Sequence, residues 1–237
     1  MSPHCRGQSR QIKLLKHEFA IASVLSHASI ISMWEWGEVN GLAYIVMEHF
    51  AGPNLKQWIH ESRQARSGLI ERILLHVGGA LEHLHGQGII HRDVKPDNVL
   101  VGEHGQVKLI DFALARKMRG WLGSWFQSSP KPQGTLSYMS PEQIRNQAQD
   151  QCADIYSFGC VAYELVCGRP PFTGDTPHDL LQKHLHSPIP SLKTAEPQVA
   201  DTFDELVQAT LAKQPQDRPQ SMSALLAHIR KCHVFKD

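Results

Sequence analysis

The chain has 237 residues, of which 41% are hydrophobic and 20% are charged, and its formal net charge is +1. This composition predicts a folded globular protein and excludes a disordered or collagen-like chain. The near-neutral charge argues against nucleic acid as the main partner, so we expect no nucleic-acid binding.

The sequence shows no signal for secretion or for membrane insertion. Residues 1–11 are polar and basic and lack the apolar region of a secretory signal. No apolar run reaches the length of a membrane span, so we expect no membrane segment in this chain. The five cysteines show no CxxC spacing, which is typical of reduced thiols and favours a cytoplasmic location.

The first third of the chain predicts a helix followed by a small antiparallel sheet. Apolar residues recur at helical spacing over residues 11–26. Strand-like runs follow at 32–37 and 42–48. Asn40-Gly41 lies between the two runs and is a strong signal for a hairpin turn.

The middle of the chain predicts short elements around a loop. Asn54 is expected to cap a short helix that ends at His60, because its side chain can accept a hydrogen bond from the first helical turn. A longer apolar helix follows at 68–86, and the remaining predictions are strands at 99–101 and 107–110 and a loop over 111–142.

The last part of the chain is helical by pattern. Helices are predicted at 153–167, 177–186, 200–212 and 220–232, separated by Gly and Pro residues. Cys160 and Cys167 are expected on one buried face of the first of these helices. A helix, a small antiparallel sheet and a mainly helical remainder together indicate the α+β class.

The strongest functional signal is a polar loop that follows the predicted helix 68–86 and precedes the predicted strand 99–101. It reads His91-Arg92-Asp93-Val94-Lys95-Pro96-Asp97-Asn98. Phosphoryl transfer requires an acceptor for the hydroxyl proton, a cation near the transferred phosphate and oxygen ligands for magnesium. Asp93, Lys95 and Asn98 provide these three groups, and Asp111 provides a second carboxylate after the next turn.

This loop resembles the catalytic loop of the protein kinase family in its Ser/Thr form. Further matches follow in the family's order over roughly residues 12–232: Asp111-Phe112-Ala113, Gly134-Thr135, Tyr138 to Glu142, Asp154 to Gly159, Arg169 to Phe172, and Asp217-Arg218-Pro219. The chain is identified as a member of the protein kinase superfamily, resembling the bacterial-type (Hanks-type) Ser/Thr protein kinases.

The resemblance implies a role for each of these residues. Asp93 would be the catalytic base, and Lys95 would neutralise charge on the moving phosphoryl group. The expected ATP-binding residues are Glu18, Glu48, Phe50, Lys95, Asn98 and Asp111, of which Asn98 and Asp111 would also bind Mg²⁺. Glu48 to Phe50 would be the hinge that meets adenine, with Met47 as the gatekeeper before it, and Arg218 would pair with Glu142.

Two departures from the family pattern stand out. No G-x-G-x-x-G precedes Glu18, and Lys13 is too close to Glu18 to be the ATP-positioning lysine, so we expect Lys13 on the helix. Loss of that lysine would lower the rate by about a hundredfold to a thousandfold. Ala113 replaces a glycine, and because Ala reaches positive φ only at a cost, we expect altered flexibility of this loop.

The resemblance therefore implies a protein-kinase-like two-lobe fold whose small lobe lacks its first strands and Gly-rich loop. The whole of 1–237 is expected to be a single kinase domain, with about 12–50 in the small lobe and about 51–237 in the mainly helical large lobe. In the segment before Leu136, Trp121, Trp125 and Phe126 are expected to pack on the large lobe. Ser124, Ser128 and Ser129 are candidates for phosphorylation.

Three functional hypotheses follow. The first is a Ser/Thr protein kinase that transfers the γ-phosphoryl group of ATP to protein Ser/Thr hydroxyls, as Lys95 and Thr135 favour. The second is an inactive kinase-like interaction module or a truncated gene product that lacks the ATP-positioning lysine. The third, a small-molecule kinase, is disfavoured because residues 135–142 resemble the peptide-docking end of protein kinases.

Overall fold

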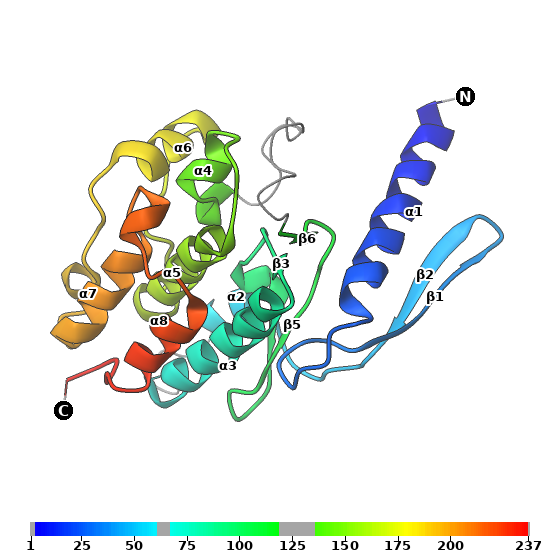
Figure 1. Cartoon of the computed structure of the whole chain (residues 1–237). Coiled ribbons are helices and arrows are strands. Elements are labelled where there is room, and N and C mark those ends of the chain that lie inside the picture. The colour runs from blue at the N-terminus through cyan, green and yellow to red at the C-terminus, as the bar shows by residue number, and fades with distance from the viewer. Residues whose placement is uncertain (1–2, 61–66, 119–135, 237) are drawn as a thin grey trace.

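The computed structural model describes residues 3–60, 67–118 and 136–236. Several residues singled out above lie outside this range: Trp121, Ser124, Trp125, Phe126, Ser128, Ser129, Gly134 and Thr135. Figure 1 shows two parts, a helix with a hairpin on one side and a larger, mainly helical body on the other.

The smaller part consists of α1 (Pro3–Ala22), β1 (Met33–Val39) and β2 (Leu42–Met47). The two strands pair antiparallel, with Val39 opposite Leu42, and α1 packs against both of them. The turn residues Asn40 and Gly41 have φ values of 52° and 79°. Two successive left-handed residues form the type I′ turn that suits a two-residue hairpin, so the predicted turn is confirmed.

The predicted end of the first helix is wrong. The helix stops at Ala22 and not at residue 26, because the chain after it turns to join the larger part. The amide of Ile31 donates to the carbonyl of Leu109 at 3.1 Å, and the amide of Leu109 donates to the carbonyl of Ser29 at 2.8 Å. Lys13 lies on α1 with an exposed side chain, as predicted.

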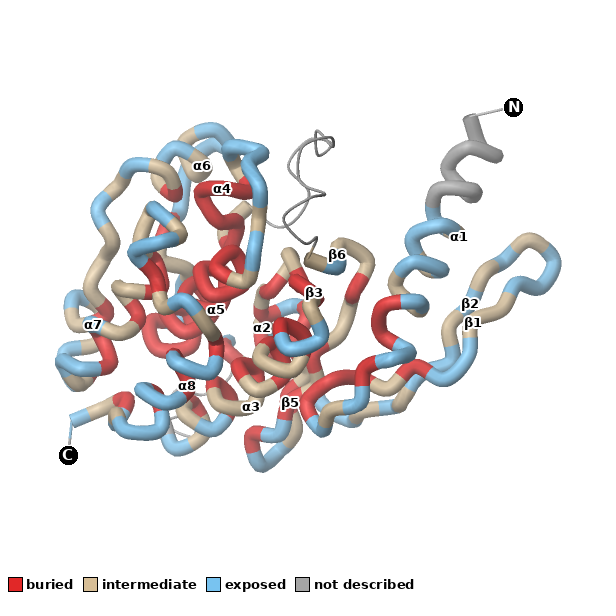
Figure 2. The backbone as a smooth tube through the Cα atoms, in the orientation of Figure 1, coloured by how far each residue is buried: buried red, intermediate tan, exposed pale blue. Residues whose placement is uncertain are grey.

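The larger part is built around α5 (Gln151–Cys167), which packs against α3 (Ser67–Gly86) and α7 (Asp201–Thr210), while α8 (Met222–Ile229) packs on α3. Figure 2 shows the buried residues gathered along α5. Every α5 residue after Gln151 is buried. Cys160 and Cys167 are buried as expected, and the burial extends to the other faces of the helix because other elements surround it.

Short elements complete the larger part. The helices are α2 (Leu55–His60), α4 (Pro141–Ile144) and α6 (Pro177–His186). The 3-10 turns are η2 (Pro96–Asn98), η4 (Leu136–Tyr138), η5 (Leu192–Thr194) and η6 (Pro215–Asp217). The strands pair as β3 (Ile89–Ile90) with β6 (Arg116–Lys117) and β4 (Val99–Val101) with β5 (Val107–Leu109).

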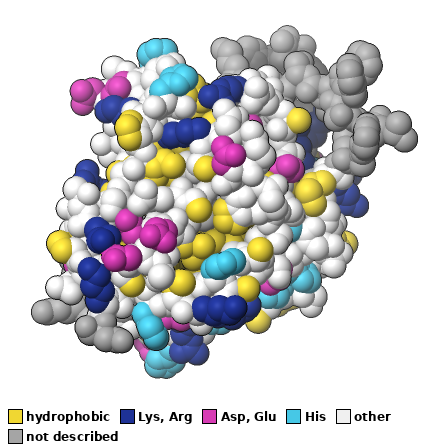
Figure 3. Space-filling model, turned by 60° about the vertical axis from the view of Figure 1, so that its left-hand side comes forward, with side chains coloured by type: hydrophobic (Ala, Val, Ile, Leu, Met, Phe, Trp, Pro, Cys, Tyr) yellow, Lys and Arg dark blue, Asp and Glu magenta, His cyan; other side chains and the backbone are white. Residues whose placement is uncertain are grey.

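The α+β fold with two parts is confirmed, and in the described residues the sheet of the smaller part has two strands. The segment 111–142 was predicted as loop, yet it contains β6, η4 and α4. Among the described helices, none is both long and apolar enough to cross a membrane. On the face shown in Figure 3, Lys and Arg side chains are interspersed with Asp and Glu rather than separated by sign.

Candidate active site

The polar loop between β3 and β4 is held in a strained backbone conformation. Arg92 has a φ of 70°, which costs energy for a residue other than glycine. Asp154 of α5 stabilises this conformation, since its carboxylate accepts the amide of His91 and the amide of Arg92, both at 2.8 Å. The central helix therefore fixes the loop in place.

Asp154 is ionised although it is fully buried. Burial alone would raise the pKa of its carboxyl, but the hydrogen bond from His85, the nearby His91 and the amide of Arg92 together hold the pKa below its usual value. His85 Nε2 lies 2.9 Å from Asp154 Oδ2. A buried charge that accepts several hydrogen bonds is a rigid anchor.

The loop brings Asp93, Lys95 and Asn98 together. Lys95 Nζ donates to Asp93 Oδ2 at 2.6 Å, and Asn98 Nδ2 donates to the same oxygen at 3.1 Å and to the Asp93 carbonyl at 2.9 Å. The side chain of Asp93 is 10% exposed. Its second oxygen, Oδ1, has no hydrogen-bond partner among the described residues, so it can accept a proton from a bound hydroxyl.

Asp111 lies next to this group. The amide of Ile110 donates to the carbonyl of Asn98 at 2.9 Å, so the residue directly before Asp111 is hydrogen-bonded to the loop. Because Asn98 Nδ2 points toward Asp93, its amide oxygen remains for a metal. Asp111 Oδ1 accepts the amide of Ala113 at 3.2 Å, which leaves Oδ2. Both oxygens are hard donors of the kind that Mg²⁺ prefers.

The remaining ligands of a Mg²⁺ ion would have to come from phosphate and water. Among the described residues, no cluster of three or more His, Cys, Asp or Glu side chains could hold a metal ion by itself. Mg²⁺ commonly binds through one or two protein oxygens together with substrate phosphates, so the donor set fits such an ion.

The premise of the expectation for Ala113, a positive φ at this residue, is wrong. The positive φ in this segment falls on Asp111, at 64°, and Ala113 is not one of the non-glycine residues with a positive φ. The backbone at Ala113 therefore carries no penalty for its Cβ atom.

Glu18 reaches the active-site region from α1. Its Oε1 accepts the amide of Phe112 at 3.2 Å, and His17 Nε2 lies 2.8 Å from the carbonyl of Ala115. Burial raises the pKa of Glu18, the Phe112 amide opposes this effect, and the charge of Asp111 raises the pKa further. No Lys or Arg forms an ion pair with Glu18 among the described residues. Glu18 thus docks α1 onto the segment after β5.

The segment after β2, which the sequence predicts as the hinge, is held in place by the side chain of Glu48. Glu48 Oε2 accepts Lys108 Nζ at 2.8 Å and the amide of Ser32 at 3.2 Å, so the side chain of Glu48 is engaged with β5 and with the residue that precedes β1. Burial alone would raise the pKa of Glu48, but Lys108 and Ser32 hold it below its usual value. A ligand at this segment would therefore contact the backbone of Glu48 and not its carboxylate.

The hinge also runs close to β4. A Cβ atom on Gly52 would lie 2.2 Å from the carbonyl oxygen of Val101, so only glycine fits there. The ring of Phe50 packs near Gly102, and its amide has no partner among the described residues. Met47, the expected gatekeeper, is 43% exposed at the end of β2.

Two ion pairs with buried carboxylates stabilise the larger part around the site. Arg218 forms two parallel hydrogen bonds to Glu142, both at 2.8 Å, which is the pairing that the sequence predicted. The second pair joins Lys56 of α2 to Glu164 of α5, and Tyr138 donates to the other Glu164 oxygen at 2.5 Å. It links α2, η4 and the central helix α5.

Sequence reasoning missed this second pair and the Lys108 contact. The available signal was a charge inside an apolar run. Glu164 lies within the apolar stretch 153–167, and Lys108 lies within a buried strand. A carboxylate in such a position requires a cationic partner, but the sequence does not say which residue supplies it.

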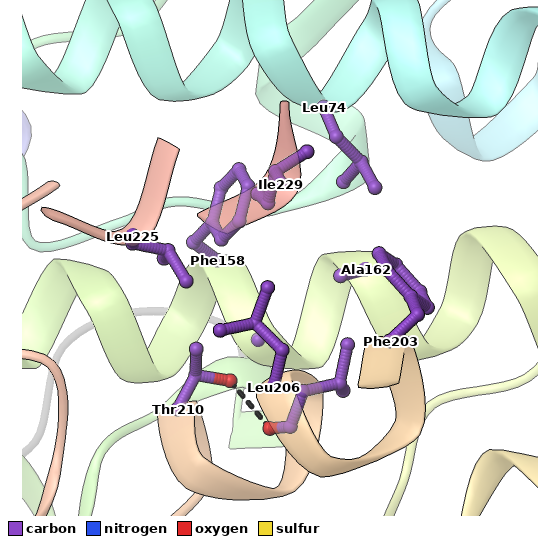
Figure 4. Close-up of a pocket in the computed structure, with 10 residues that line it drawn as sticks. Leu74, Phe158, Ala162, Phe203, Leu206, Thr210, Leu225 and Ile229 are labelled. Atoms are coloured by element: carbon purple, nitrogen blue, oxygen red, sulfur yellow. Dashed lines mark hydrogen bonds between the residues drawn. The ribbon is translucent and has the colours of Figure 1, made fainter. Parts of the chain in front are cut away.

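A small apolar cavity lies away from this site. Figure 4 shows its lining side chains converging from α3, α5, α7 and α8, among them Leu74, Phe158 and Leu225. The hydroxyl of Thr210 donates to the carbonyl of Val207 at 2.6 Å, so it presents no unpaired polar group. The cavity holds about 10 Å³, the lower limit for one water molecule, and is therefore a packing feature.

Comparison with known proteins agrees with this arrangement. A family model described as the protein kinase domain matches residues 4–229. The chain is 38% identical over 213 residues to the probable serine/threonine-protein kinase PknB of Corynebacterium glutamicum, covering 86% of this chain and 33% of that protein. It is 35% identical over 223 residues to serine/threonine-protein kinase PknB of Mycobacterium tuberculosis, covering 92% of this chain and 35% of that protein.

A third relative has a similar level of identity. The probable serine/threonine-protein kinase SCO3848 of Streptomyces coelicolor is 34% identical over 221 residues, which cover 92% of this chain and 33% of that protein. The chain spans about a third of the length of these relatives. With nearly its whole length matched by the family model, the chain belongs to the protein kinase family and resembles its bacterial, Hanks-type serine/threonine members.

Proposed function

We propose that this chain is a Ser/Thr protein kinase that transfers the γ-phosphoryl group of ATP to hydroxyl groups of protein acceptors. The observation that carries the proposal is the environment of Asp93. One of its oxygens is held by Lys95 and Asn98, and the other has no partner among the described residues. A carboxylate fixed in this way can orient a hydroxyl and accept its proton.

The chemistry follows from the charges around Asp93. The acceptor oxygen forms a bond to the γ-phosphorus, the bond from that phosphorus to the bridging oxygen breaks, and ADP leaves. The hydroxyl proton passes to Asp93, and the ammonium of Lys95 stabilises the charge on the transferred group. Asn98 and Asp111 would hold Mg²⁺, which neutralises phosphate charge when it is bound.

ATP would lie between the hinge and Asp111. The carbonyl of Glu48 and the amide of Phe50 would meet the adenine edge, a role supported by the engagement of the Glu48 side chain elsewhere. Glu18 would border the phosphates through its contact with Phe112.

We further propose that residues 1–237 form a single kinase domain, with about 12–50 in the small lobe, and that it works in the cytoplasm. The matched range 4–229 supports the first point. The second point is supported by the sequence, whose five cysteines show no CxxC spacing, as is typical of reduced thiols.

Transfer of labelled γ-phosphate to a Ser/Thr peptide library in the presence of Mg²⁺ tests this function. The purified chain should produce phosphoserine or phosphothreonine, and the Asp93→Asn variant should lose at least about 99% of the activity. The matched control is Asp97→Asn, an exposed acid on η2, which should keep its rate within about twofold of the wild type.

Glu18 has no cationic partner among the described residues, and this favours a second candidate, an inactive kinase-like interaction module. That module would show neither a labelled product nor an increase in Tm with Mg²⁺ and ATP, and this result would overturn the proposed kinase. Labelled product that disappears in the Asp93→Asn variant would overturn the alternative.

A further inference from the structure

Three histidines gather where the loop after α1 meets α3. His27 lies in this loop, and His76 and His83 lie on α3. The rings of His27 and His83 stack with centroids 5.3 Å apart and planes inclined by 28°. All three side chains are half-buried.

The hydrogen bonds of this cluster define the protonation state of His27. The amide of Ser29 donates to His27 Nδ1 at 3.1 Å, so this ring nitrogen carries no proton. The hydroxyl of Ser29, a residue that is 2% exposed, lies 3.1 Å from His76 Nδ1. Protonation of His27 at Nδ1 would replace an attractive contact by two facing donors.

The cluster holds a segment that leads to the candidate metal ligand. The carbonyl of Ser29 accepts the amide of Leu109, and the amide of Ile31 donates to the carbonyl of Leu109. Lys108 Nζ donates to the carbonyl of Ile30 at 3.3 Å. Leu109 is the last residue of β5 and precedes Asp111 by two positions. Movement of the Ser29 loop therefore displaces the strand that positions Asp111.

We propose that His27, His76 and His83 form an acid-sensitive latch that positions β5 when His27 is neutral and releases the loop 29–31 when His27 takes up a proton. The proposal makes His27 a positioning residue that acts on Asp111 through Leu109. Its importance for catalysis rests on the proposed kinase function, whereas the latch itself is a property of the fold.

Most of the charges that face the cluster lower the pKa of His27. Burial lowers the pKa of His27, and His83, His76 and Lys108 of β5 lower it further, while Glu82 of α3 opposes them. Burial followed by the charge of Arg72 lowers the pKa of His76. A lowered pKa means that the unfolded or released state binds the proton more readily. The latch is therefore intact above about pH 6.5 and weakens as the pH falls below that value.

Amide hydrogen exchange measured between about pH 8 and about pH 5 tests the latch directly. The protection factors of Ser29, Ile31 and Leu109 should fall by up to about tenfold for each pH unit below about 6.5, since one proton is taken up on release. The amides of α5 serve as the internal reference and should keep their protection factors over this range.

Two variants separate the latch from a purely structural role. In His27→Asn, the side-chain oxygen can still accept the Ser29 amide but does not titrate, so the acid-induced loss of protection should disappear. The matched control His104→Asn changes an exposed histidine in the β4–β5 turn and should keep the wild-type pH dependence.

Imidazole NMR of the unmodified chain provides a measurement that does not depend on how the variants fold. The His27 ring should titrate below about pH 6.5 together with a shift of the Ser29 amide resonance. Protection factors that do not change with pH, or an acid response that persists in His27→Asn, would overturn the latch. Neither result depends on phosphate transfer, so failure of the latch and failure of the proposed function are distinguishable.

Discussion

At the scale of single residues, the groups that do chemistry could be predicted from the sequence, and the groups that hold them in place could not. Asp93, Lys95 and Asn98 lie within six residues of each other, so one short motif specifies all three. Their support comes from far away in the chain. Asp154 lies 62 residues from Arg92, and Glu164 lies 108 residues from Lys56. Residue spacing carries no information about such partners, although a lone charge in an apolar run signals that one exists.

His184 is a buried residue whose titration should be measurable in the stability of the whole chain. Tyr156 hydroxyl lies 2.9 Å from its Nδ1, and its Nε2 is buried without a described partner. Burial, followed by the charge of Lys213, lowers the pKa of His184 to about 4. Because the folded-state pKa is below the unfolded value, the stabilising contribution is complete above about pH 6.5 and is lost as the pH falls toward 4.

The variant His184→Phe removes this titration. Its free energy of unfolding should be lower than that of the wild type at about pH 8, because Tyr156 loses its partner. The difference should shrink by up to about 3 kcal/mol between about pH 6.5 and about pH 4. Urea unfolding across this range measures both values. His186→Phe, on an exposed position of the same helix, is the control, and an equal pH dependence in the two variants would contradict the assignment.

At the scale of elements, predictions succeeded where local residues end an element. The predicted bounds 177–186 match α6, because Thr176 caps its first turn and Pro177 starts it. Predictions failed where contacts with residues far away in the sequence determine whether an element forms or where it ends. The end of α1 depends on the contact of the following loop with Leu109, and β6 exists because Arg116 and Lys117 pair with β3. Two-residue strands of this kind have no sequence pattern of their own.

The crossing of α5 and α7 depends on one glycine. A Cβ atom on Gly159 would lie 2.0 Å from Thr210 Oγ1 and 3.2 Å from a Leu211 methyl group. Gly159→Ala should lower the free energy of unfolding by about 1–3 kcal/mol, since a well-packed crossing has no room for the methyl group. Denaturant unfolding measures the change. Gly86→Ala is the control, because nothing lies within 4 Å of its Cβ position, and equal stability of the two variants would contradict the close crossing.

At the scale of the whole molecule, the two parts meet along the candidate active site. Glu18 contacts Phe112, His17 contacts Ala115, and the Ser29 loop contacts Leu109, so the smaller part touches the segment around Asp111 at three points. Asp93, in contrast, is held from the larger part through Asp154 and α5. The acceptor side of the site is thus built into the larger part, and the metal and nucleotide side depends on how the two parts dock.

On the acceptor side, the side chains of Asp93 and Lys95 contact at 2.6 Å and should act as one catalytic unit. The most direct test is a double-mutant cycle on kcat for transfer from labelled ATP, using Asp93→Asn, Lys95→Met and the combined variant. Each single change should lower kcat by at least about a hundredfold, and the combined variant should be no slower than the slower single variant by more than a few-fold. If the loss of kcat in the combined variant equals the product of the two single losses, Asp93 and Lys95 act independently and not as one unit. A wild-type rate equal to that of Asp93→Asn would contradict the catalytic role of Asp93 and, with it, the proposed kinase function.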